Sequence, residues 1–186
     1  MRIYGPTGSS SYVAMSAKPA ILEAARHLAS TEGPMGLTID RVIEAAQISK
    51  GGFFYHFASK DEMVTALVYE EAERLEATIK AYAGKGHRLH KALMLTAFDK
   101  IRDDTGLMAV FIAAVSVDRR LATFVSDMLS GWTDKLVADG LTLDQAVGVR
   151  LLIDGMFMTS LLYEGQLPES EFAIVETLID RIVPES

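Results

Sequence analysis

Cysteine is absent from this chain, and nowhere do apolar and polar residues alternate in the manner of a β-strand. Without cysteine, the chain has no disulfide framework and no thiolate zinc site. Without alternation, the sequence offers no half-buried sheet. Long apolar runs are missing too. The most apolar stretch, LLIDGMFMTSLLY, is short and is interrupted by Asp154, so we expect no membrane-spanning segment.

Basic residues are in short supply, with 18 Lys and Arg against 25 Asp and Glu and a net charge of −7. Residues 1–63 contain six basic and six acidic residues, so the remainder of the chain carries all of the net charge. An acidic average argues against non-specific binding to polyanions, although it leaves room for a small local site. The N-terminus lacks the features of a signal peptide, and we expect a cytoplasmic protein.

The first 17 residues are rich in Gly and Ser and show no periodicity. We interpret residues 1–17 as a disordered extension, with Met15 as a candidate natural start. The alternative is a flexible arm that touches a partner. Because Arg2 supplies the only charge in this stretch, the extension is favoured over the arm.

From residue 18 onward, apolar residues recur at helical spacing, separated by Gly, Pro and capping residues. Thr38 is suited to N-cap a short helix, and Ser59 with Glu62 forms a capping box. Residues 18–63 therefore predict a domain that includes three short helices, and residues 64–186 predict a larger helical domain. The fold is predicted to be all-α with about nine helices, at residues 21–33, 39–45, 50–57, 60–81, 88–102, 106–115, 118–138, 143–163 and 169–182.

The segment ISKGGFFYHF, residues 48–57, combines two glycines with four aromatic rings. Two glycines destabilise a helix by roughly 2 kcal/mol relative to alanine, so a compensating role is expected. Two short helices joined by a tight turn indicate a helix-turn-helix, whose second helix enters the major groove of DNA. Gly51 and Gly52 would let the backbone approach the duplex closely. Phe53 and Phe57 are four residues apart and share a face, which we place toward the domain core.

Polar groups beside that inward face are suited to bind phosphate. Tyr55 and His56 can donate from hydroxyl and imidazole to phosphate oxygens. Lys60 falls in the first turn of the next helix, where an ammonium group and free backbone N–H groups favour an anion. Aromatic clusters at helical spacing are usually just core. The polar groups of Tyr55, His56 and Lys60 together, followed by a capped helix, nevertheless favour phosphate binding.

The stretch LTIDRVIEAAQISKGGFFYHFASKDEMV resembles the DNA-binding signature of the TetR family of bacterial transcriptional regulators. In that family a Thr opens the second helix, a small-residue turn leads into Ser-Lys-Gly, and an aromatic-His-Phe run precedes a Ser-Lys pair. The likeness covers about residues 18–68 and implies a helix-turn-helix domain followed by a helical ligand-binding and dimerisation domain. By this resemblance Lys50 and the backbone of Gly51 and Gly52 face bases. The DNA-binding residues that it implies are Thr38, Ser49, Lys50, Gly51, Gly52, Tyr55, His56 and Lys60.

Three residues depart from the family pattern. Gln47 replaces the usual turn glycine, so either it adopts a left-handed conformation or the turn differs slightly. Gly52 stands where a hydroxyl residue is common. Phe54 stands where a phosphate-binding Tyr is usual, which leaves Tyr55 to compensate. We therefore expect sparse direct readout, dominated by Lys50 on guanine, with DNA shape contributing at uncontacted positions.

The two C-terminal helices are expected to form a dimer interface. The helix at 143–163 is apolar almost all round, and the helix at 169–182 carries a broad apolar stripe. A helix without a polar face must be covered on both sides. The pair predicts a four-helix interface in a homodimer, which is also where the TetR family dimerises. A symmetric dimer suits a palindromic operator, because one short helix contacts few base pairs.

The helices between residues 88 and 138 are rich in Met and aromatic residues, which line adaptable pockets but also form ordinary cores. The resemblance implies that this region encloses a small-molecule effector. Asp99 and Thr159 are further candidate polar anchors. The candidate ligand-binding residues are Met94, Phe98, Phe111, Phe124, Asp127, Met128, Trp132, Asp154 and Phe157.

Three ionisable residues have alternative interpretations. Asp154, inside an apolar helix, can recognise a cationic ligand, pair across a dimer, or form an i, i+4 ion pair with Arg150, which we favour. His87 and His90 are three residues apart and lack a third ligand within reach by sequence. We interpret them as a solvated helix start rather than a metal site, and we expect no cofactor.

The predicted function is a ligand-responsive DNA-binding transcriptional regulator, most often a repressor in this family. Its predicted partners are a double-stranded DNA operator, a second copy of the chain and an unknown small-molecule effector. An enzyme is not expected, because no nucleophile is paired with a base and no phosphate-cradling loop or metal set occurs. The alternative is a helical protein-interaction module that has lost DNA binding, which the neutral N-terminal domain and the missing hydroxyl at Phe54 favour.

Overall fold

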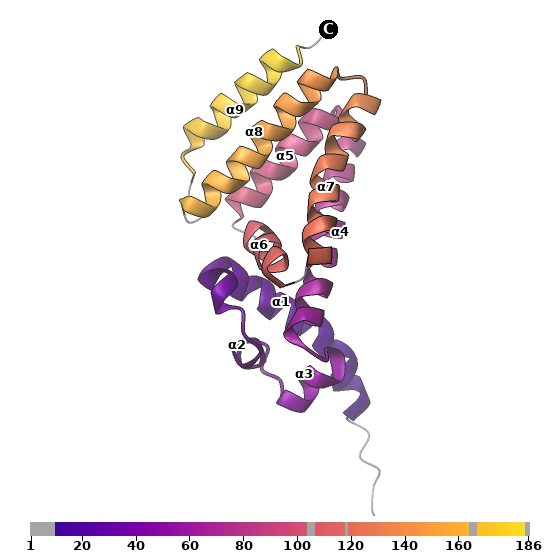
Figure 1. Ribbon diagram of the computed structural model, residues 1–186, viewed down its shortest axis with the longest axis vertical. Coiled ribbons are helices and arrows are strands. Elements are labelled where there is room, and N and C mark those ends of the chain that lie inside the picture. The colour runs from indigo at the N-terminus through magenta and orange to yellow at the C-terminus, as the bar shows by residue number, and fades with distance from the viewer. Residues whose placement is uncertain (1–9, 104–106, 118, 164–166, 185–186) are drawn as a thin grey trace, which may run out of the picture.

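The computed structural model describes residues 10–103, 107–117, 119–163 and 167–184. Over these ranges the chain forms helices and turns without any strand, which confirms the predicted all-α fold (Figure 1). The largest difference from the predicted ends after residue 39 is at the fourth helix, which continues beyond residue 81 to Gly84. The helices are α1 (Ser10–Gly36), α2 (Ile39–Ala45), α3 (Lys50–His56), α4 (Lys60–Gly84), α5 (Leu89–Arg102), α6 (Leu107–Val117), α7 (Arg119–Ala138), α8 (Leu143–Leu162) and α9 (Glu169–Ile182).

The first helix is longer than the sequence predicts. It begins at Ser10, so residues 10–17, expected to belong to a disordered extension, are helical. α1 runs through Pro19, which has no backbone N–H and usually marks the start of a helix, so the sequence pattern predicts the helix only from residue 21. Residues 10–17 contain no Gly or Pro and extend the helix backward without a new nucleus. Residues 1–9 lie outside the described residues. Near its C-terminus α1 kinks at Gly33, whose φ of 69° breaks the regular helix where the sequence predicts its end.

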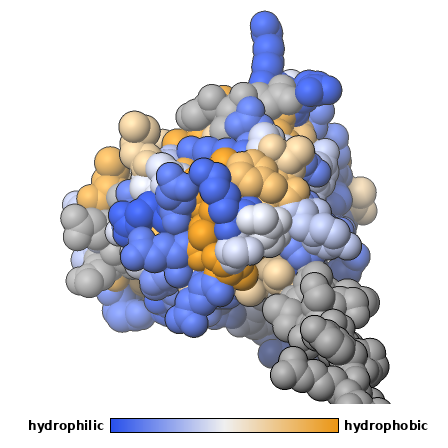
Figure 2. Space-filling view, turned by 90° about the horizontal axis from the view of Figure 1, so that it is seen from below, coloured by the Kyte–Doolittle hydropathy of each residue, from blue (hydrophilic) through white to orange (hydrophobic). Residues whose placement is uncertain are grey.

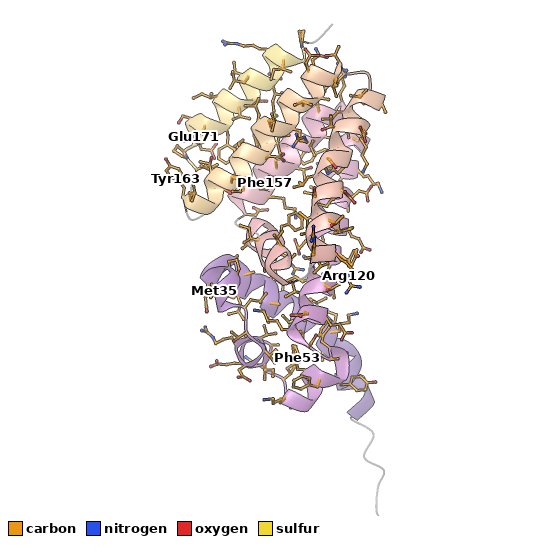
Figure 3. All side chains as sticks on the ribbon, viewed as in Figure 1. Met35, Phe53, Arg120, Phe157, Tyr163 and Glu171 are labelled. Atoms are coloured by element: carbon orange, nitrogen blue, oxygen red, sulfur yellow. The ribbon has the colours of Figure 1, made fainter. Side chains whose placement is uncertain are left out.

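The lower part of the molecule packs α1, α2, α3 and the start of α4 into one unit (Figure 1). Phe53 and Phe57 are buried in it, as the sequence predicts, together with Leu28 and Val42. Figure 3 labels Phe53 among the side chains inside this unit. Burying a Phe side chain contributes about 1.5–3 kcal/mol. The two inward rings therefore hold the short α3 in place, because a helix of this length is not stable alone.

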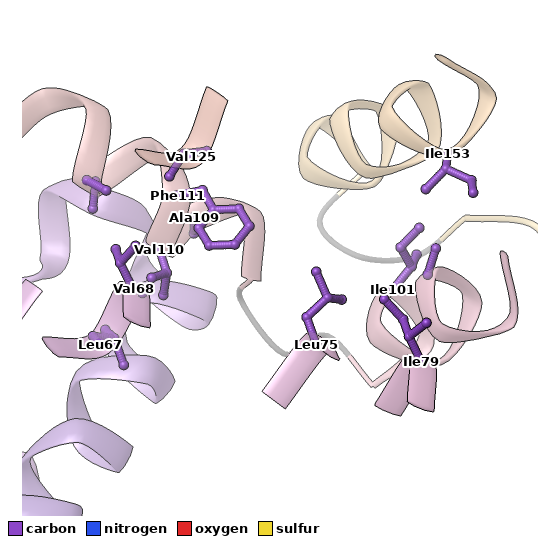
Figure 4. Packing of buried hydrophobic residues seen from close by; sticks show 14 of the residues in the cluster. Leu67, Val68, Leu75, Ile79, Ile101, Ala109, Val110, Phe111, Val125 and Ile153 are labelled. Atoms are coloured by element: carbon purple, nitrogen blue, oxygen red, sulfur yellow. The ribbon is translucent and has the colours of Figure 1, made fainter. Parts of the chain in front are cut away.

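The fourth helix joins this unit to the upper part, where α5 and α6 pack against it, α7 and α8 pack on these two helices, and α9 lies outermost against α8 (Figure 1). The short α6 contacts α1, α4, α7 and α8. Its Val110 lies beside Leu67 and Val68 of α4, and Leu75 and Ile79 continue the buried row along α4 (Figure 4). One continuous core therefore connects the two parts. No described helix combines the length and the apolar character needed to cross a membrane.

A buried ion pair ties α1 to α4. Arg26 is 7% exposed and donates from Nε to the carboxylate of Glu71, which is 1% exposed. Its guanidinium also pairs with Glu23 and, at 3.2 Å, with Glu70. Burial lowers the pKa of Arg26, but the hydrogen bond to Glu71 and the charges of Glu71, Glu23 and Glu70 together outweigh burial, and the pKa is raised. The guanidinium stays charged, so Glu71 depends on it for compensation inside the protein.

Candidate DNA-binding surface and effector pocket

The turn between α2 and α3 is closed by backbone hydrogen bonds. The N–H of Ile48 donates to the carbonyl oxygen of Ile43 at 3.2 Å, and the N–H of Gln47 donates to that of Glu44 at 3.2 Å. This pattern ends a helix with one residue in the left-handed region. Gln47 occupies that position with a φ of 53°. The sequence left open whether Gln47 is left-handed or the turn differs. Gln47 is left-handed, and the turn keeps its usual form.

One face of α3 is exposed at the lower end of the molecule. Tyr55 is 76% exposed and Phe54 is 45% exposed, and Lys50 and Gly51 are exposed as well. Figure 2 views this end from below and shows a narrow hydrophobic strip surrounded by hydrophilic residues. Because Phe53 and Phe57 anchor the opposite face, the exposed face is presented on a rigid element.

The two glycines of α3 differ in their surroundings. Ser49 caps the helix by accepting the N–H of Gly52 at 3.0 Å, and a Cβ at Gly52 would approach the same Oγ to 3.3 Å. A Cβ at Gly51 would meet nothing closer than this Oγ at 3.9 Å. Packing within the protein therefore gives a reason for Gly52 but none for Gly51. On the exposed face of α3 the protein itself therefore leaves room for a side chain at Gly51.

The other candidate DNA contacts surround α3. Thr38 is exposed and caps α2, where its Oγ1 accepts the N–H of Arg41 at 3.4 Å, so its hydroxyl hydrogen remains free to donate. Ser59 caps α4 by accepting the N–H of Glu62 at 3.1 Å, as predicted. Lys60 is half-buried in the first turn of α4, next to the acidic Asp61. Acidic neighbours in this turn offset part of the positive potential expected there.

His56 has one ring nitrogen turned into the protein. Its Nε2 is buried and has no hydrogen-bond partner among the described residues. The ring lies edge-on to Tyr55, with centroids 5.0 Å apart. A phosphate contact from His56 is therefore left to Nδ1, since Nε2 cannot reach a ligand outside the protein.

Two neighbouring hollows in the upper part of the molecule share Leu75 of α4 and Trp132 of α7 in their walls. The inner hollow has a volume of about 200 Å³ and is bounded by residues from α4, α5, α6, α7 and α8. Figure 3 labels Phe157 on α8, and this residue is one of those that line the hollow. Its lining residues are Leu75, Leu93, Ala97, Phe111, Leu129, Trp132, Arg150, Ile153, Asp154, Phe157 and Met158.

An ion pair supplies the polar groups of the inner hollow. Arg150 donates to Asp154 at 2.7 Å, and its Nε donates to Thr133 at 3.0 Å. The favoured i, i+4 pairing is confirmed. Burial raises the pKa of Asp154, and Arg150 offsets part of this rise. The wall that contains this ion pair can therefore orient a polar group of a ligand that is otherwise apolar.

The outer hollow has a volume of about 430 Å³ and lies between α4 and α7. Its wall combines aromatic and Met side chains with three carboxylates and one ammonium group. The lining residues are Tyr69, Ala72, Glu73, Leu75, Glu76, Phe124, Asp127, Met128, Trp132 and Lys135.

Comparisons with known families match both parts of the chain. Residues 21–67 match the sequence model described as bacterial regulatory proteins, tetR family. Residues 87–183, more than half of the chain, match the one described as tetracyclin repressor-like, C-terminal domain. The chain belongs to the TetR family.

Curated relatives match this TetR-family chain over a short stretch. The HTH-type transcriptional repressor AcnR of Corynebacterium efficiens is 35% identical over 65 residues, which are 35% of this chain and 35% of AcnR. AcnR of Corynebacterium glutamicum is 37% identical over 59 residues, 32% of this chain and 31% of AcnR. The match thus spans about a third of the length of these relatives.

Solved structures share the fold over most of the chain. A TetR-family member from Streptomyces coelicolor superimposes with a TM-score of 0.70 at 18% identity, covering 91% of this chain and 99% of that one. The multidrug binding protein EbrR, complexed with malachite green, gives a TM-score of 0.68 at 20% identity with the same coverage of 91% and 99%. A transcriptional regulator from a Rhodococcus species gives 0.75 at 22% identity, covering 90% and 96%.

Most of the candidate ligand residues of this TetR-family protein lie at the two hollows. Trp132 lines both hollows, and Asp127 lines the outer one with Phe124 and Met128. Met94 and Phe98 line neither. Met94 is fully buried, and the Phe98 ring lies at 5.0 Å from that of Phe172, so these two residues belong to the core. The candidates at the inner hollow are Phe111, Trp132, Asp154 and Phe157.

Two other expectations need correction. His90, interpreted as part of a solvated helix start, is 6% exposed, and burial lowers its pKa, with Arg88 adding to the effect. Its neighbour His87 is exposed, so only one of the pair matches that interpretation. Asp99 accepts a hydrogen bond from the Tyr82 hydroxyl, and Thr159 donates to Gly155, and neither lines a hollow. Within the described residues no group of three or more His, Asp or Glu is placed to hold a metal ion.

Several lining residues escaped prediction. Leu75 and Glu73 belong to α4, which the sequence marks as a connection between domains rather than a pocket wall. Lys135 and Arg150 are charged residues of a kind that usually lies at the surface, yet both line a hollow. Their helical register, which brings them to the same face as Trp132 or Asp154, is the signal that was available for them.

Proposed function

We propose that this chain is a ligand-responsive transcriptional repressor that binds a palindromic DNA operator as a homodimer. The exposed face of α3 carries the proposal, because Gly51 lacks a side chain where the protein itself leaves room for one. Close approach of a backbone to a duplex gives that position a reason. We propose further that Thr38, Tyr55, His56 and Lys60 hold phosphates and that Lys50 reaches a base, within a DNA-binding domain at residues 18–63. Such a protein acts in the cytoplasm, where bacterial DNA lies.

The second copy would bind at α8 and α9. Both helices carry large apolar side chains that are exposed in the single chain, among them Leu151 at 56%, Met158 at 53% and Ile174 at 57%. Large apolar side chains exposed on two helices in contact indicate an interface. Two copies related by a two-fold axis place two α3 helices on successive major grooves, which a single copy cannot do.

The effector is proposed to act through α4. Leu75 of α4 lines both hollows, and one turn earlier Glu71 binds Arg26 of α1. α4 follows α3 after only Phe57, Ala58 and Ser59. A shift of α4 on ligand binding therefore moves α3, and an effector that prefers the shifted state reduces the population with correctly spaced recognition helices. The complexes of EbrR with small dyes support a small-molecule effector for this chain.

The test is binding to a labelled duplex from upstream of the chain's own coding region, over a salt series. We expect tight binding that survives random competitor DNA and weakens steeply with salt, as phosphate contacts require. Gly51→Leu should abolish it while leaving the circular dichroism spectrum unchanged. Failure to bind this duplex or any member of a random duplex pool contradicts the proposal.

That failure would favour a helical protein-interaction module without DNA binding. The exposed Phe54 ring and the zero net charge of residues 1–63 are the observations behind this second candidate. It predicts that a partner protein, not DNA, protects α3 from hydrogen exchange.

A further inference from the structure

The outer hollow has the composition of a site for organic cations. Glu73, Glu76 and Asp127 bring three carboxylates to it against the single ammonium group of Lys135. Aromatic rings from Tyr69, Phe124 and Trp132 and the thioether of Met128 line the same space. Ring faces and carboxylates both attract positive charge, and here the exposed carboxylates lie at the rim of a space with aromatic walls.

The ammonium group of Lys135 already binds to an aromatic ring and a carboxylate of this hollow. The Nζ of Lys135 lies 4.0 Å from the centroid of the Trp132 ring and 3.8 Å from a carboxylate oxygen of Glu76. The Lys135 side chain is 52% exposed, so it is not locked there by packing. A solvated ammonium on a flexible stem is readily displaced by a cation that fills the hollow and loses less hydration.

Two carboxylates of the hollow do not pair with Lys135. Neither Glu73 nor Asp127 forms an ion pair with any residue that the structure describes. Trp132 is 7% exposed, and its ring forms part of the wall of the hollow. The hollow thus contains two carboxylates without an ion-pair partner among the described residues, next to an aromatic face.

From these contacts we infer that the outer hollow binds a lipophilic organic cation, with an aromatic part on Trp132 and its positive charge near Glu73 and Asp127. The cation displaces the Lys135 ammonium from the Trp132 ring. Because Leu75 and Trp132 also line the inner hollow, the apolar remainder of the ligand extends toward that space. The inference rests on the proposed function, since it names the chemical class of the effector.

The test uses two probes of the same shape and opposite charge, tetraphenylphosphonium and tetraphenylborate. Trp132 is the only tryptophan in the chain and lines both hollows, so its fluorescence reports a ligand in either of them, and the variants below locate the charge. We expect saturable quenching by tetraphenylphosphonium with a Kd at least about tenfold lower than for tetraphenylborate. Equal or tighter binding of the anion overturns the inference.

Matched variants locate the charge preference. Glu73→Gln and Asp127→Asn should each weaken tetraphenylphosphonium binding by about two- to fivefold, the usual effect of one partly exposed ion pair. Lys135→Met should tighten it by a similar factor, because the competing ammonium is gone. Asp134→Asn is the control, since Asp134 is exposed on α7 and does not line the hollow. If the control weakens binding as much as Asp127→Asn, the preference is a general effect of net charge and the inference fails.

Operator binding by the same preparations separates this inference from the proposed function. A protein that binds its operator but shows no cation preference overturns the effector class alone. A protein that binds the cation with the expected variant pattern but binds no duplex supports the cation site and overturns the repressor function.

Discussion

Arg26 and Glu71 illustrate how much one pair of residues can decide in this molecule. Both are almost fully buried, and they lie on different helices, α1 and α4. They are not equivalent. Arg26 also contacts Glu23 and Glu70, whereas Glu71 has Arg26 alone as its ionic partner among the described residues. Removing one member of a buried pair leaves the other as an uncompensated charge, and the penalty depends on what else can compensate it.

We therefore predict an asymmetric effect on stability. Arg26→Met should lower the free energy of unfolding by about 3–5 kcal/mol, because it isolates Glu71. Glu71→Gln should cost clearly less, because Arg26 keeps two carboxylates. Urea denaturation at one fixed protein concentration measures both variants. Equal losses in the two variants would contradict this account of the cluster.

His90 gives the protein a predictable response to acid. Burial lowers its pKa in the folded chain, as does Arg88, so the unfolded chain takes up a proton on His90 at a higher pH than the folded chain. Stability therefore falls as the pH drops below about 6.5, the ordinary pKa of histidine, until the folded pKa is reached. Above that range the side chain is neutral in both states and contributes no pH dependence.

The prediction is that His90→Gln reduces the loss of stability between pH 7.5 and pH 5.5. Urea unfolding at the two pH values measures the difference, and NMR titration of the His90 ring protons checks its cause. An unchanged loss in the variant would show that other groups produce it.

At the scale of elements, α3 is a short helix that two buried rings hold and two glycines weaken. Because a Cβ at Gly51 would meet nothing closer than 3.9 Å, alanine fits there without strain. Alanine stabilises a helix interior by about 1 kcal/mol relative to glycine, and somewhat less near the first turn. A chain selected only for stability would gain from this change.

Gly51→Ala should therefore raise the melting temperature while it weakens operator binding, because the added methyl group holds the helix away from the duplex. Thermal unfolding and a DNA titration on the same sample measure the two effects. Gly131→Ala is a suitable control, since Gly131 lies within α7 with open space around its Cβ and far from α3. It should gain stability without any loss of DNA affinity.

At the scale of the whole molecule, the exposed apolar side chains of α8 and α9 govern assembly. Leu151 and Ile174 are both more than half exposed in the single chain. Replacing each by Glu in one double variant places four charges in a symmetric interface, where they are desolvated without partners. We expect this variant to sediment as a monomer and to lose cooperative binding to a palindromic duplex.

Analytical ultracentrifugation measures the assembly state directly. The single chain should retain its helical content by circular dichroism, because both side chains are exposed within it. A variant that remains dimeric would place the interface elsewhere on the molecule.

The sequence by itself determined the all-α class, nearly every helix end and the inward rings of α3. These features depend on local spacing, capping groups and turn residues, which act between neighbours along the chain. It did not determine which conformation Gln47 adopts, because backbone strain at one residue is balanced by packing on both sides of the turn. Nor did it separate Met94 and Phe98, which are core, from Phe111 and Trp132, which line a hollow. Only tertiary structure decides which side of a helix finds a neighbour, as it does for the partnership of Arg26 with Glu71, 45 positions away.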